Sequence, residues 1–250
     1  MKIAVCIKRV PDMESRFRIA GDHKSVDEAG LKFIMSDFDG YAVEVALQIT
    51  EKKGQGEVVA VSLGPDAVQE QLRTALSMGA ARAIHLKADR VPADGFVIAR
   101  ALAAELKGGG YDLIMFGKHA MDSMNGVVGP MTAELLGLPN VSAASKLEIA
   151  NGKGTARHEL EGGAEILEFT LPAVVSIDEG IARPRYPSLK GIMAAKKRPL
   201  ESRPAQLDIP RLEVSKVELP PERQGGRIIG EGRAAVPELI RLLQTEAKVL

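Results

Sequence analysis

Residues 57–86 read EVVAVSLGPDAVQEQLRTALSMGAARAIHL, and this stretch decides the fold. Its first part, Glu57–Leu63, is a short apolar run that predicts a buried strand, and a Gly-Pro pair ends it. Asp66–Met78 then places apolar residues at helical spacing, and a glycine ends that helix. Ala83–Leu86 follows as a second strand. A strand, a helix and a strand in this order predict one unit of a parallel sheet.

The same alternation runs through the first 140 residues. Further strands are predicted at Lys2–Ile7 and Asp112–Phe116, and further helices at Tyr41–Lys53, Gly95–Leu106 and Val127–Leu136. The strands are almost continuously apolar, as in a parallel sheet that helices cover on both faces. The predicted fold is therefore α/β, with a doubly wound, mostly parallel sheet.

The pattern changes after residue 145. Lys146–Ala150 and Thr155–Leu160 flank a glycine-containing turn, which predicts an antiparallel hairpin added to the sheet. Ala164–Leu171 and Ala173–Ile177 follow as strands.

The C-terminal part is different again. From about residue 199 the chain is Pro-rich and polar until Val236–Lys248, a stretch with the pattern of an amphipathic helix. Such a tail is either disordered or an arm that packs on a partner subunit, and its leucine stripe favours the arm. We therefore divide the chain into an α/β domain at 1–198 and an extended C-terminal arm with its helix at 199–250.

Composition excludes several classes of protein. The chain has 250 residues with 33 basic and 33 acidic side chains, and this balance argues against a general nucleic-acid binder. One cysteine excludes an internal disulfide and a cysteine-based metal cluster, and favours a reducing compartment. No apolar run approaches the roughly 20 residues of a membrane helix. We expect a cytoplasmic protein that is not inserted in a membrane.

Three segments should lie at the edge of the sheet where doubly wound folds bind their ligands. They are Cys6–Asp12, Met35–Asp39 and Gly117–Gly129. The third, GKHAMDSMNGVVG, is the most informative, because it precedes a predicted helix. Free backbone N–H groups and the helix dipole at such a start suit a phosphate group.

An ordinary helix cap is the alternative interpretation of that loop, with Asp122, Ser123 or Asn125 as the cap. Spacing alone favours the cap, because the loop matches neither of the common glycine-rich nucleotide patterns. Its length favours a ligand, because it exceeds what a simple strand-to-helix turn needs. The four histidines lack metal-ligand spacing, so no metal site is predicted. Nucleophile–base sets and carboxylate pairs are not evident either.

Residues 183–199, RPRYPSLKGIMAAKKRP, fit neither a helix nor a strand, because prolines and a glycine interrupt both patterns. The segment nevertheless carries four large apolar side chains and a basic run. We expect Ile192 and Met193 to fill a local core, Leu189 to stay exposed, and Gly191 to permit a tight bend.

Several stretches together resemble the beta subunit of electron transfer flavoprotein. They cover most of the chain: VCIKRVPD, FDGYAVEVAL, AVSLGPDAVQEQLRTALSMGAARAIHL, YDLIMFGKHAMD and LPAVVSIDEGIARPRYPSLKGIMAAKK. GK-x-A-x-D after a strand and PRY-x-x-L-x-x-IM-x-AKK are specific to that family rather than general features of α/β folds.

The resemblance implies a function. The family works as a heterodimer whose alpha subunit holds most of a redox-active FAD. The beta subunit supplies one wall of the flavin site and binds AMP in a structural role. The complex takes electrons from acyl-CoA dehydrogenases and related flavin dehydrogenases and passes them to a membrane quinone oxidoreductase. By resemblance, the domain at 1–198 is of the adenine-nucleotide-binding type, the arm packs on the alpha subunit, and the chain is an electron carrier rather than an enzyme.

The resemblance also implies site residues. Phe38 matches an aromatic residue near the flavin ring, whereas Met13 stands where the family often has a tyrosine. The implied cofactor-binding residues are Cys6, Ser36, Asp37, Phe38, Asp39, Leu63, Gly117, Lys118, His119, Ala120, Met121, Asp122, Ser123, Met124, Asn125, Gly126, Val127 and Val128.

Residues 183–199 match the loop with which the family grips partner dehydrogenases. Leu189 aligns with an aliphatic anchor that enters a pocket of the partner, and the prolines would stiffen an extended loop around it. The basic residues would steer the loop toward acidic partners. The implied partner-recognition residues are Tyr186, Leu189, Ile192, Met193, Lys196 and Lys197.

Other interpretations stay open at this point. The Val128-Gly129-Pro130 ending of the loop resembles the electron-bifurcating branch, in which the beta subunit carries a second FAD in place of AMP. Two features favour AMP: the Ser36–Asp39 stretch, and the IM-x-AKK ending of the recognition segment. A stand-alone adenine-nucleotide sensor would have no evident use for the long arm. A nucleotide-dependent hydrolase ranks last, because the sequence offers no base, nucleophile or metal cluster.

Overall fold

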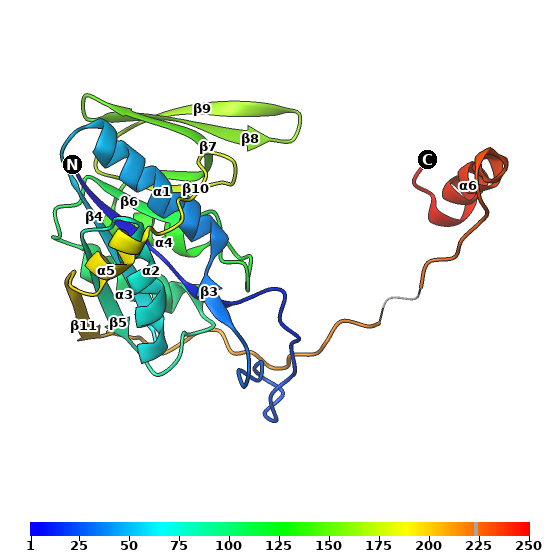
Figure 1. Ribbon diagram of the computed structural model, residues 1–250, viewed down its shortest axis with the longest axis horizontal. Helices are drawn as coiled ribbons and strands as arrows, with labels where there is room; N and C mark the ends of the chain where they lie inside the picture. Colours follow the sequence, from blue (N-terminus) through cyan, green and yellow to red (C-terminus); the bar gives the residue numbers. More distant parts are fainter. Residues whose placement is uncertain (223–224) are drawn as a thin grey trace.

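A computed structural model describes residues 1–222 and 225–250 (Figure 1). Its main sheet has nine strands in the order β11-β5-β4-β1-β6-β10-β7-β8-β9. These strands are β1 (Lys2–Cys6), β4 (Glu57–Gly64), β5 (Arg82–Lys87), β6 (Leu113–Gly117), β7 (Asn140–Ala150), β8 (Lys153–Leu160), β9 (Gly163–Thr170), β10 (Ala173–Ile177) and β11 (Leu200–Pro204). Pairing is parallel from β11 to β7 and antiparallel from β7 to β9. A separate antiparallel pair joins β2 (Arg9–Pro11) to β3 (Phe33–Met35).

Helices cover both faces of the parallel part. On one face lie α1 (Asp37–Lys52) and α2 (Gln69–Met78), and on the other lie α3 (Gly95–Leu106) and α4 (Val128–Leu136). The strands alternate between the two cores: in β1, Ile3 and Val5 pack with α1 and α2, whereas Ala4 and Cys6 pack with α3. The predicted doubly wound α/β fold with an added antiparallel hairpin is confirmed. None of the described helices is long and apolar enough to cross a membrane.

Most element positions agree with the sequence, and the boundaries differ for local reasons. Helix α1 begins at Asp37 rather than Tyr41, because two acidic residues in its first turn favour a helix start; Ser36 occupies the N-cap position without a side-chain cap hydrogen bond. The helix predicted at Asp66–Met78 opens with one 3₁₀ turn, Asp66–Val68, before α2.

The prediction that residues 183–199 form neither a helix nor a strand was wrong in part. Leu189–Ala195 forms a short helix, α5, and the Ser188 hydroxyl caps it by accepting the N–H of Gly191 at 3.0 Å. Gly191 does not form a bend. It lies inside α5, where a side chain would collide with the backbone oxygen of Ser77 in α2. The glycine that looked like a helix breaker is therefore what lets α5 pack closely on α2.

The boundary at residue 199 also differs from the structure. Residues 200–204 are the edge strand β11, which pairs with β5 over five residues. His85 is fully buried beneath this edge, with Nδ1 3.0 Å from the Ser202 hydroxyl and Nε2 2.9 Å from the Gly64 carbonyl oxygen. The chain leaves the domain only after these residues.

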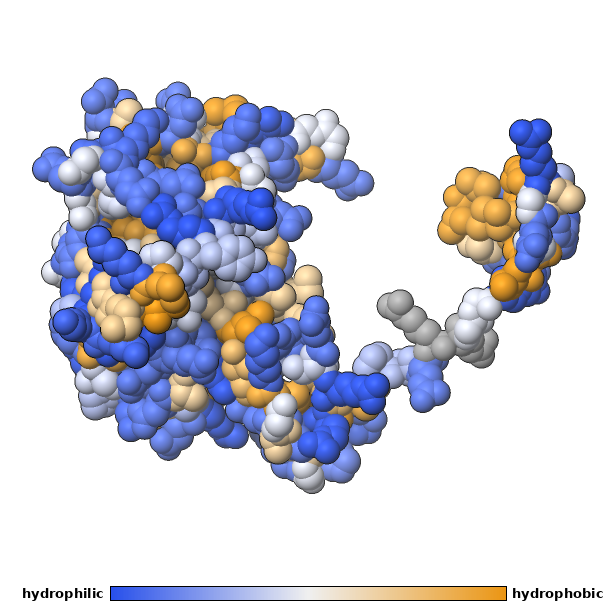
Figure 2. All heavy atoms as spheres, viewed as in Figure 1, coloured by the Kyte–Doolittle hydropathy of each residue, from blue (hydrophilic) through white to orange (hydrophobic). Residues whose placement is uncertain are grey.

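The C-terminal helix stands apart from the α/β domain (Figure 1). It comprises α6 (Val236–Leu242) and a following π-helical turn (Leu243–Ala247). Figure 2 shows apolar side chains gathered on one side of this segment, as an amphipathic helix requires. The apolar residues exposed there are Val236, Leu239, Ile240, Val249 and Leu250.

Candidate functional site

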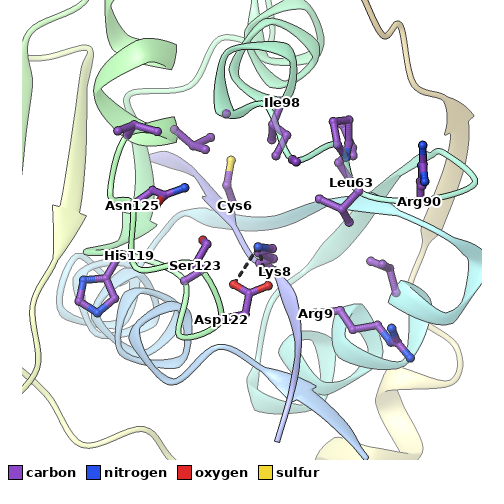
Figure 3. A pocket seen from close by; sticks show the side chains of 18 of the residues that line it. Cys6, Lys8, Arg9, Leu63, Arg90, Ile98, His119, Asp122, Ser123 and Asn125 are labelled. Carbon is purple, nitrogen blue, oxygen red and sulfur yellow. Dashed lines mark hydrogen bonds and ion pairs between the residues drawn. The ribbon is translucent and has the colours of Figure 1, made fainter. Parts of the chain in front are cut away.

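A cavity of about 1460 Å³ opens at the carboxyl ends of β1, β4 and β6 (Figure 3). Its lining includes the first residues of α3 and α4, and a side chain on Gly95 would lie 2.9 Å from Val127 Cγ2. Two helix starts therefore meet beside one cavity. The first N–H groups of a helix have no partner within it, and the helix dipole places positive charge there. The start of α4, which no side chain caps, therefore suits an anion, whereas the Asp94 carboxylate caps the start of α3.

Asp39 ties the strand ends together beneath the cavity. One carboxylate oxygen accepts the N–H of Lys8 at 2.7 Å, and the other accepts the N–H of Gly117 at 3.0 Å. Burial raises the pKa of Asp39 to about 7, and the two backbone donors oppose that rise. The carboxyl group is thus partly neutral near pH 7, which reduces its repulsion of an anionic ligand.

Gly117 is required by this arrangement. A Cβ at this position would lie 2.6 Å from the Asp39 carboxylate and 2.6 Å from Phe38 Cβ. The close approach of α1 to the end of β6 therefore depends on a residue without a side chain.

The loop at 118–127 borders the cavity with polar groups. Lys8 Nζ contacts Asp122 at 2.7 Å, which links the loop to the end of β1 (Figure 3). Lys118 Nζ, also at the cavity lining, pairs with Asp178 at 2.9 Å. The N-cap position of α4 is Val127, and no side chain caps this helix. The interpretation of this loop as an ordinary helix cap is therefore wrong, because none of Asp122, Ser123 and Asn125 caps α4.

Apolar side chains and two arginines line the rest of the cavity. Leu63 and Ile98 form part of its wall, which suits a flat aromatic base (Figure 3). Arg9 lies on the Phe33 ring at 3.2 Å, and Arg90 faces the opening. The uncapped start of α4, the apolar wall and the nearby cations together could hold a ligand with a flat base and a phosphate group.

A strap from the chain's later part closes one side of the cavity. Asp94 caps α3 by accepting the N–H of Phe96 at 2.9 Å. Its other oxygen accepts the N–H groups of Arg211 at 2.8 Å and Leu212 at 3.3 Å. Residues 207–214, which we call the strap, contribute lining side chains.

Most residues implied by the resemblance meet at this cavity. Those among its lining are Cys6, Asp39, Leu63, Gly117, Lys118, His119, Ala120, Asp122, Ser123, Asn125, Gly126, Val127 and Val128. The Cys6 thiol is buried, and burial raises its pKa far above the ordinary value, so it packs in the core and does not act as a nucleophile.

Five implied residues lie outside the lining. Ser36 is fully buried and its hydroxyl has no hydrogen-bond partner among the described residues. Asp37 donates its N–H to Met121 Sδ at 3.3 Å, and Met124 is exposed. Phe38 packs against the His119 ring, with 4.4 Å between ring centroids. His119 is among the lining residues, and Phe38 lies next to it outside the lining.

Sequence reasoning missed Arg9, Arg90, Asp94 and the strap. Arg9 had a signal, because it directly follows a strand whose carboxyl end was already a predicted ligand edge. The strap had none, since it forms neither a helix nor a strand whose periodicity could place it against α3.

A second candidate surface surrounds α5. Tyr186 and Leu189 are 90% and 85% exposed, which agrees with the expectation for Leu189. Ile192 and Met193 are 44% and 63% exposed, so the expectation that they fill a local core was wrong. They protrude because the inner side of α5 carries only small residues, among them the buried Ala195. We call these four side chains the apolar surface, and Figure 2 shows apolar atoms at this position.

Comparison with known proteins places the chain in a family. A family model described as the electron transfer flavoprotein domain matches residues 24–208. Electron transfer flavoprotein subunit beta of Syntrophomonas wolfei is 38% identical over 250 residues, covering 100% of this chain and 98% of the relative. The subunit beta of Bacillus subtilis is 37% identical over 260 residues, covering all of both chains.

The chain belongs to the electron transfer flavoprotein beta subunit family.

The chain is also similar to a human protein. Human electron transfer flavoprotein subunit beta is 38% identical over 233 residues, which cover 90% of this chain and 91% of the human protein. The matched residues 24–208 include the cavity lining from β4, α3, β6 and the loop at 118–127, but exclude the lining residues before residue 24 and most of the strap. Among the described residues, no group of three or more His, Cys, Asp or Glu side chains is placed to hold a metal ion.

Proposed function

We propose that this protein is the beta subunit of a heterodimeric electron transfer flavoprotein. It binds AMP in the cavity, helps an alpha subunit to enclose FAD, and docks flavin dehydrogenases of the acyl-CoA type. Electrons then pass from the complex to a membrane quinone oxidoreductase. The FAD supplies the redox chemistry, and this chain carries out no bond chemistry of its own.

The cavity at the strand ends is the observation that carries the proposal. An adenine base would lie against the apolar wall around Leu63, and the phosphate would face the start of α4 and the loop at 118–127. Lys8, paired with Asp122 at the same edge, has further N–H donors for the phosphate. Phe38 and His119 would face the FAD from beside this cavity, as the position of Phe38 in the family suggests.

The remaining surfaces have roles in the same proposal. The amphipathic C-terminal helix would pack its apolar side on the alpha subunit. Leu189, at the centre of the apolar surface, would enter a pocket of the dehydrogenase, while exposed Lys196 and Lys197 speed association with an acidic partner.

A second FAD in place of AMP is the alternative ligand. The cavity volume of about 1460 Å³ favours it, because this exceeds the roughly 300–1,000 Å³ that is typical of small-molecule sites. The rest of the proposed function would then belong to an electron-bifurcating complex.

Counting released cofactors tests the proposal. The chain is co-expressed with its alpha subunit, the purified complex is denatured, and FAD and AMP are quantified by chromatography. One FAD and one AMP per heterodimer are expected. Two FAD without AMP would establish the alternative, and a complex free of adenine nucleotide other than one FAD would contradict a nucleotide role for the cavity.

A further inference from the structure

Arg185 makes an unusually complete set of contacts next to the apolar surface. Its guanidinium binds Glu44 at 2.8 and 3.0 Å and Glu51 at 2.6 and 3.0 Å. Its backbone N–H also donates to Glu44 at 3.2 Å. One arginine thus holds two carboxylates that lie two helical turns apart on α1, and the chain entering α5 is fixed to that helix.

Burial makes the Glu44 contact strong. The Glu44 side chain is only 4% exposed, and Gln48 donates a further hydrogen bond to it at 2.8 Å. Burial by itself would raise the pKa of Glu44, but the bonds from Arg185 and Gln48 outweigh it and lower that pKa. A buried carboxylate bound by a forked guanidinium has defined geometry, unlike an exposed ion pair. The contact therefore restricts where Arg185 and its neighbours can lie.

Helix α5 needs such external support. It has only seven residues, contains a glycine, and would not be stable by itself in water. Its C-terminal end is held by Arg73, whose Nη1 donates to the carbonyl oxygens of Ala195 at 2.6 Å and Arg198 at 2.9 Å. Arg198 in turn donates to the carbonyl oxygens of Leu76 and Ala80 in and after α2.

The N-terminal end of α5 depends on Arg185. Between Arg185 and α5 stand Tyr186, Pro187 and the cap residue Ser188, and Leu189 is the first residue of the helix. Tyr186 and Leu189 are almost fully exposed, so packing does not fix their backbone. The Ser188 cap is a contact within this stretch, whereas the bonds of Arg185 are the nearest ones that tie it to α1.

We propose that Arg185 is a positioning residue for partner docking: through Glu44 and Glu51 it holds Tyr186 and Leu189 in the arrangement that a partner protein binds. The inference rests on the proposed docking function of the apolar surface. Side chains that are already ordered lose less conformational entropy on binding, so a held surface binds more tightly than a free one. The partner it fits has an apolar pocket with acidic groups around it, because Lys190, Lys196 and Lys197 are exposed beside the anchor.

Hydrogen exchange of the heterodimer tests the positioning directly. In Arg185→Gln, the backbone amides of residues 186–195 should exchange faster than in the unaltered protein. Arg203→Gln is the matched control, because Arg203 also binds two carboxylates, Glu105 and Glu201, but lies on β11. Unchanged exchange at 186–195 in Arg185→Gln would overturn the proposal.

Glu51→Gln guards against loss of folding. Glu51 is mostly exposed, so this change removes one of the two carboxylates that Arg185 binds without leaving a buried charge unpaired. Faster exchange at 186–195, smaller than in Arg185→Gln, is expected. If both variants exchange at the same rate as the unaltered protein, the contacts of Arg185 with Glu44 and Glu51 do not position residues 186–195.

Electron uptake from a reduced acyl-CoA dehydrogenase gives the functional readout. Arg185→Gln should raise the KM for the heterodimer about tenfold, the equivalent of ordering one or two side chains, and leave the maximal rate unchanged. Because Arg185 acts through the anchor, adding Arg185→Gln to Leu189→Ala should change the KM little further. Fully additive effects would overturn the proposal.

The same measurements separate this inference from the docking function. If Leu189→Ala leaves electron uptake unchanged, the docking function fails, whatever hydrogen exchange shows for Arg185. If Leu189→Ala raises the KM and Arg185→Gln does not, docking stands and the positioning role of Arg185 is refuted.

Discussion

At the scale of single residues, the site depends on a glycine, Gly117, where no side chain would fit. Gly117 ends β6 in contact with Phe38 and Asp39, and its N–H donates to the Asp39 carboxylate. The same carboxylate binds the end of β1, so a shift at Gly117 would move two strand ends at once. Both ends line the cavity.

Gly117→Ala should therefore lower both stability and nucleotide content. The new Cβ would lie 2.6 Å from Asp39 Oδ1, and overpacking of this kind costs about 1–3 kcal/mol. Chemical denaturation and the AMP content of the purified complex measure the two effects. Gly21→Ala is the control, since a side chain there would have nothing within 4 Å. Normal stability and nucleotide content in Gly117→Ala would contradict the close approach.

Asp39 should give the protein a specific pH dependence. Burial raises its pKa from 3.8 to about 7, so the folded protein keeps a proton that the unfolded chain releases between these values. Its contribution to stability is thus complete below about pH 4 and is lost as the pH rises through 7.

Asp39→Asn removes this titration. The free energy of unfolding of the unaltered protein, minus that of the variant, should fall between pH 5 and pH 8. Asp12→Asn is the control, because backbone and Lys32 contacts lower the pKa of exposed Asp12 and it stays ionised throughout that range. A difference for Asp39→Asn that does not change with pH would show that this carboxyl group is already ionised at pH 5.

At the scale of elements, α3 and the strap share one side chain. Asp94 satisfies a free N–H at the start of α3 and two N–H groups of the strap. An N-cap acceptor typically contributes about 1 kcal/mol to stability. The second pair of bonds has a different effect, because it ties the strap, whose Leu207, Ile209 and Leu212 are exposed, to the start of α3.

Asp94→Ala should therefore release the strap more than it destabilises the domain. Limited trypsin digestion should cut after Arg211 much faster, with a stability loss of about 1 kcal/mol. Asp208→Ala is the matched control, because Asp208 lies on the same strap and pairs with Arg100 at the surface. Equal digestion of both variants would mean that Asp94 does not hold the strap.

At the scale of the whole molecule, the C-terminal helix is separate from the folding of the domain. The described residues form two hydrophobic cores, both within the α/β domain, and α6 belongs to neither. Deleting residues 236–250 should leave the melting temperature of the domain unchanged and weaken association with the alpha subunit. Calorimetry and size-exclusion chromatography with the alpha subunit measure these effects. Undiminished association would refute the proposed role of the arm.

The sequence predicts the layered domain well because strand and helix periods carry that information. Val58–Leu63 is apolar at every position except Ser62, and Gly79 ends α2 where expected. The phosphate-binding edge follows from topology, since the carboxyl ends of parallel strands share one side of the sheet.

Features held by long-range polar contacts could not be predicted in this way. α5 is stabilised by arginines that reach the backbone more than a hundred residues away, and Gly191 is compatible with a helix only because α2 lies beside it. β11 and the strap are placed by β5 and Asp94. Neither kind of partner is visible in a local pattern.

The most direct test of the central claim is anaerobic mixing of the co-expressed heterodimer with a reduced acyl-CoA dehydrogenase, followed by flavin absorbance. The account predicts that the chain purifies with its alpha subunit in equal amounts, that the complex is yellow, and that its flavin is reduced on mixing. A chain that purifies alone and colourless in the presence of the alpha subunit, or a flavin that stays oxidised with every flavin dehydrogenase tried, would contradict it.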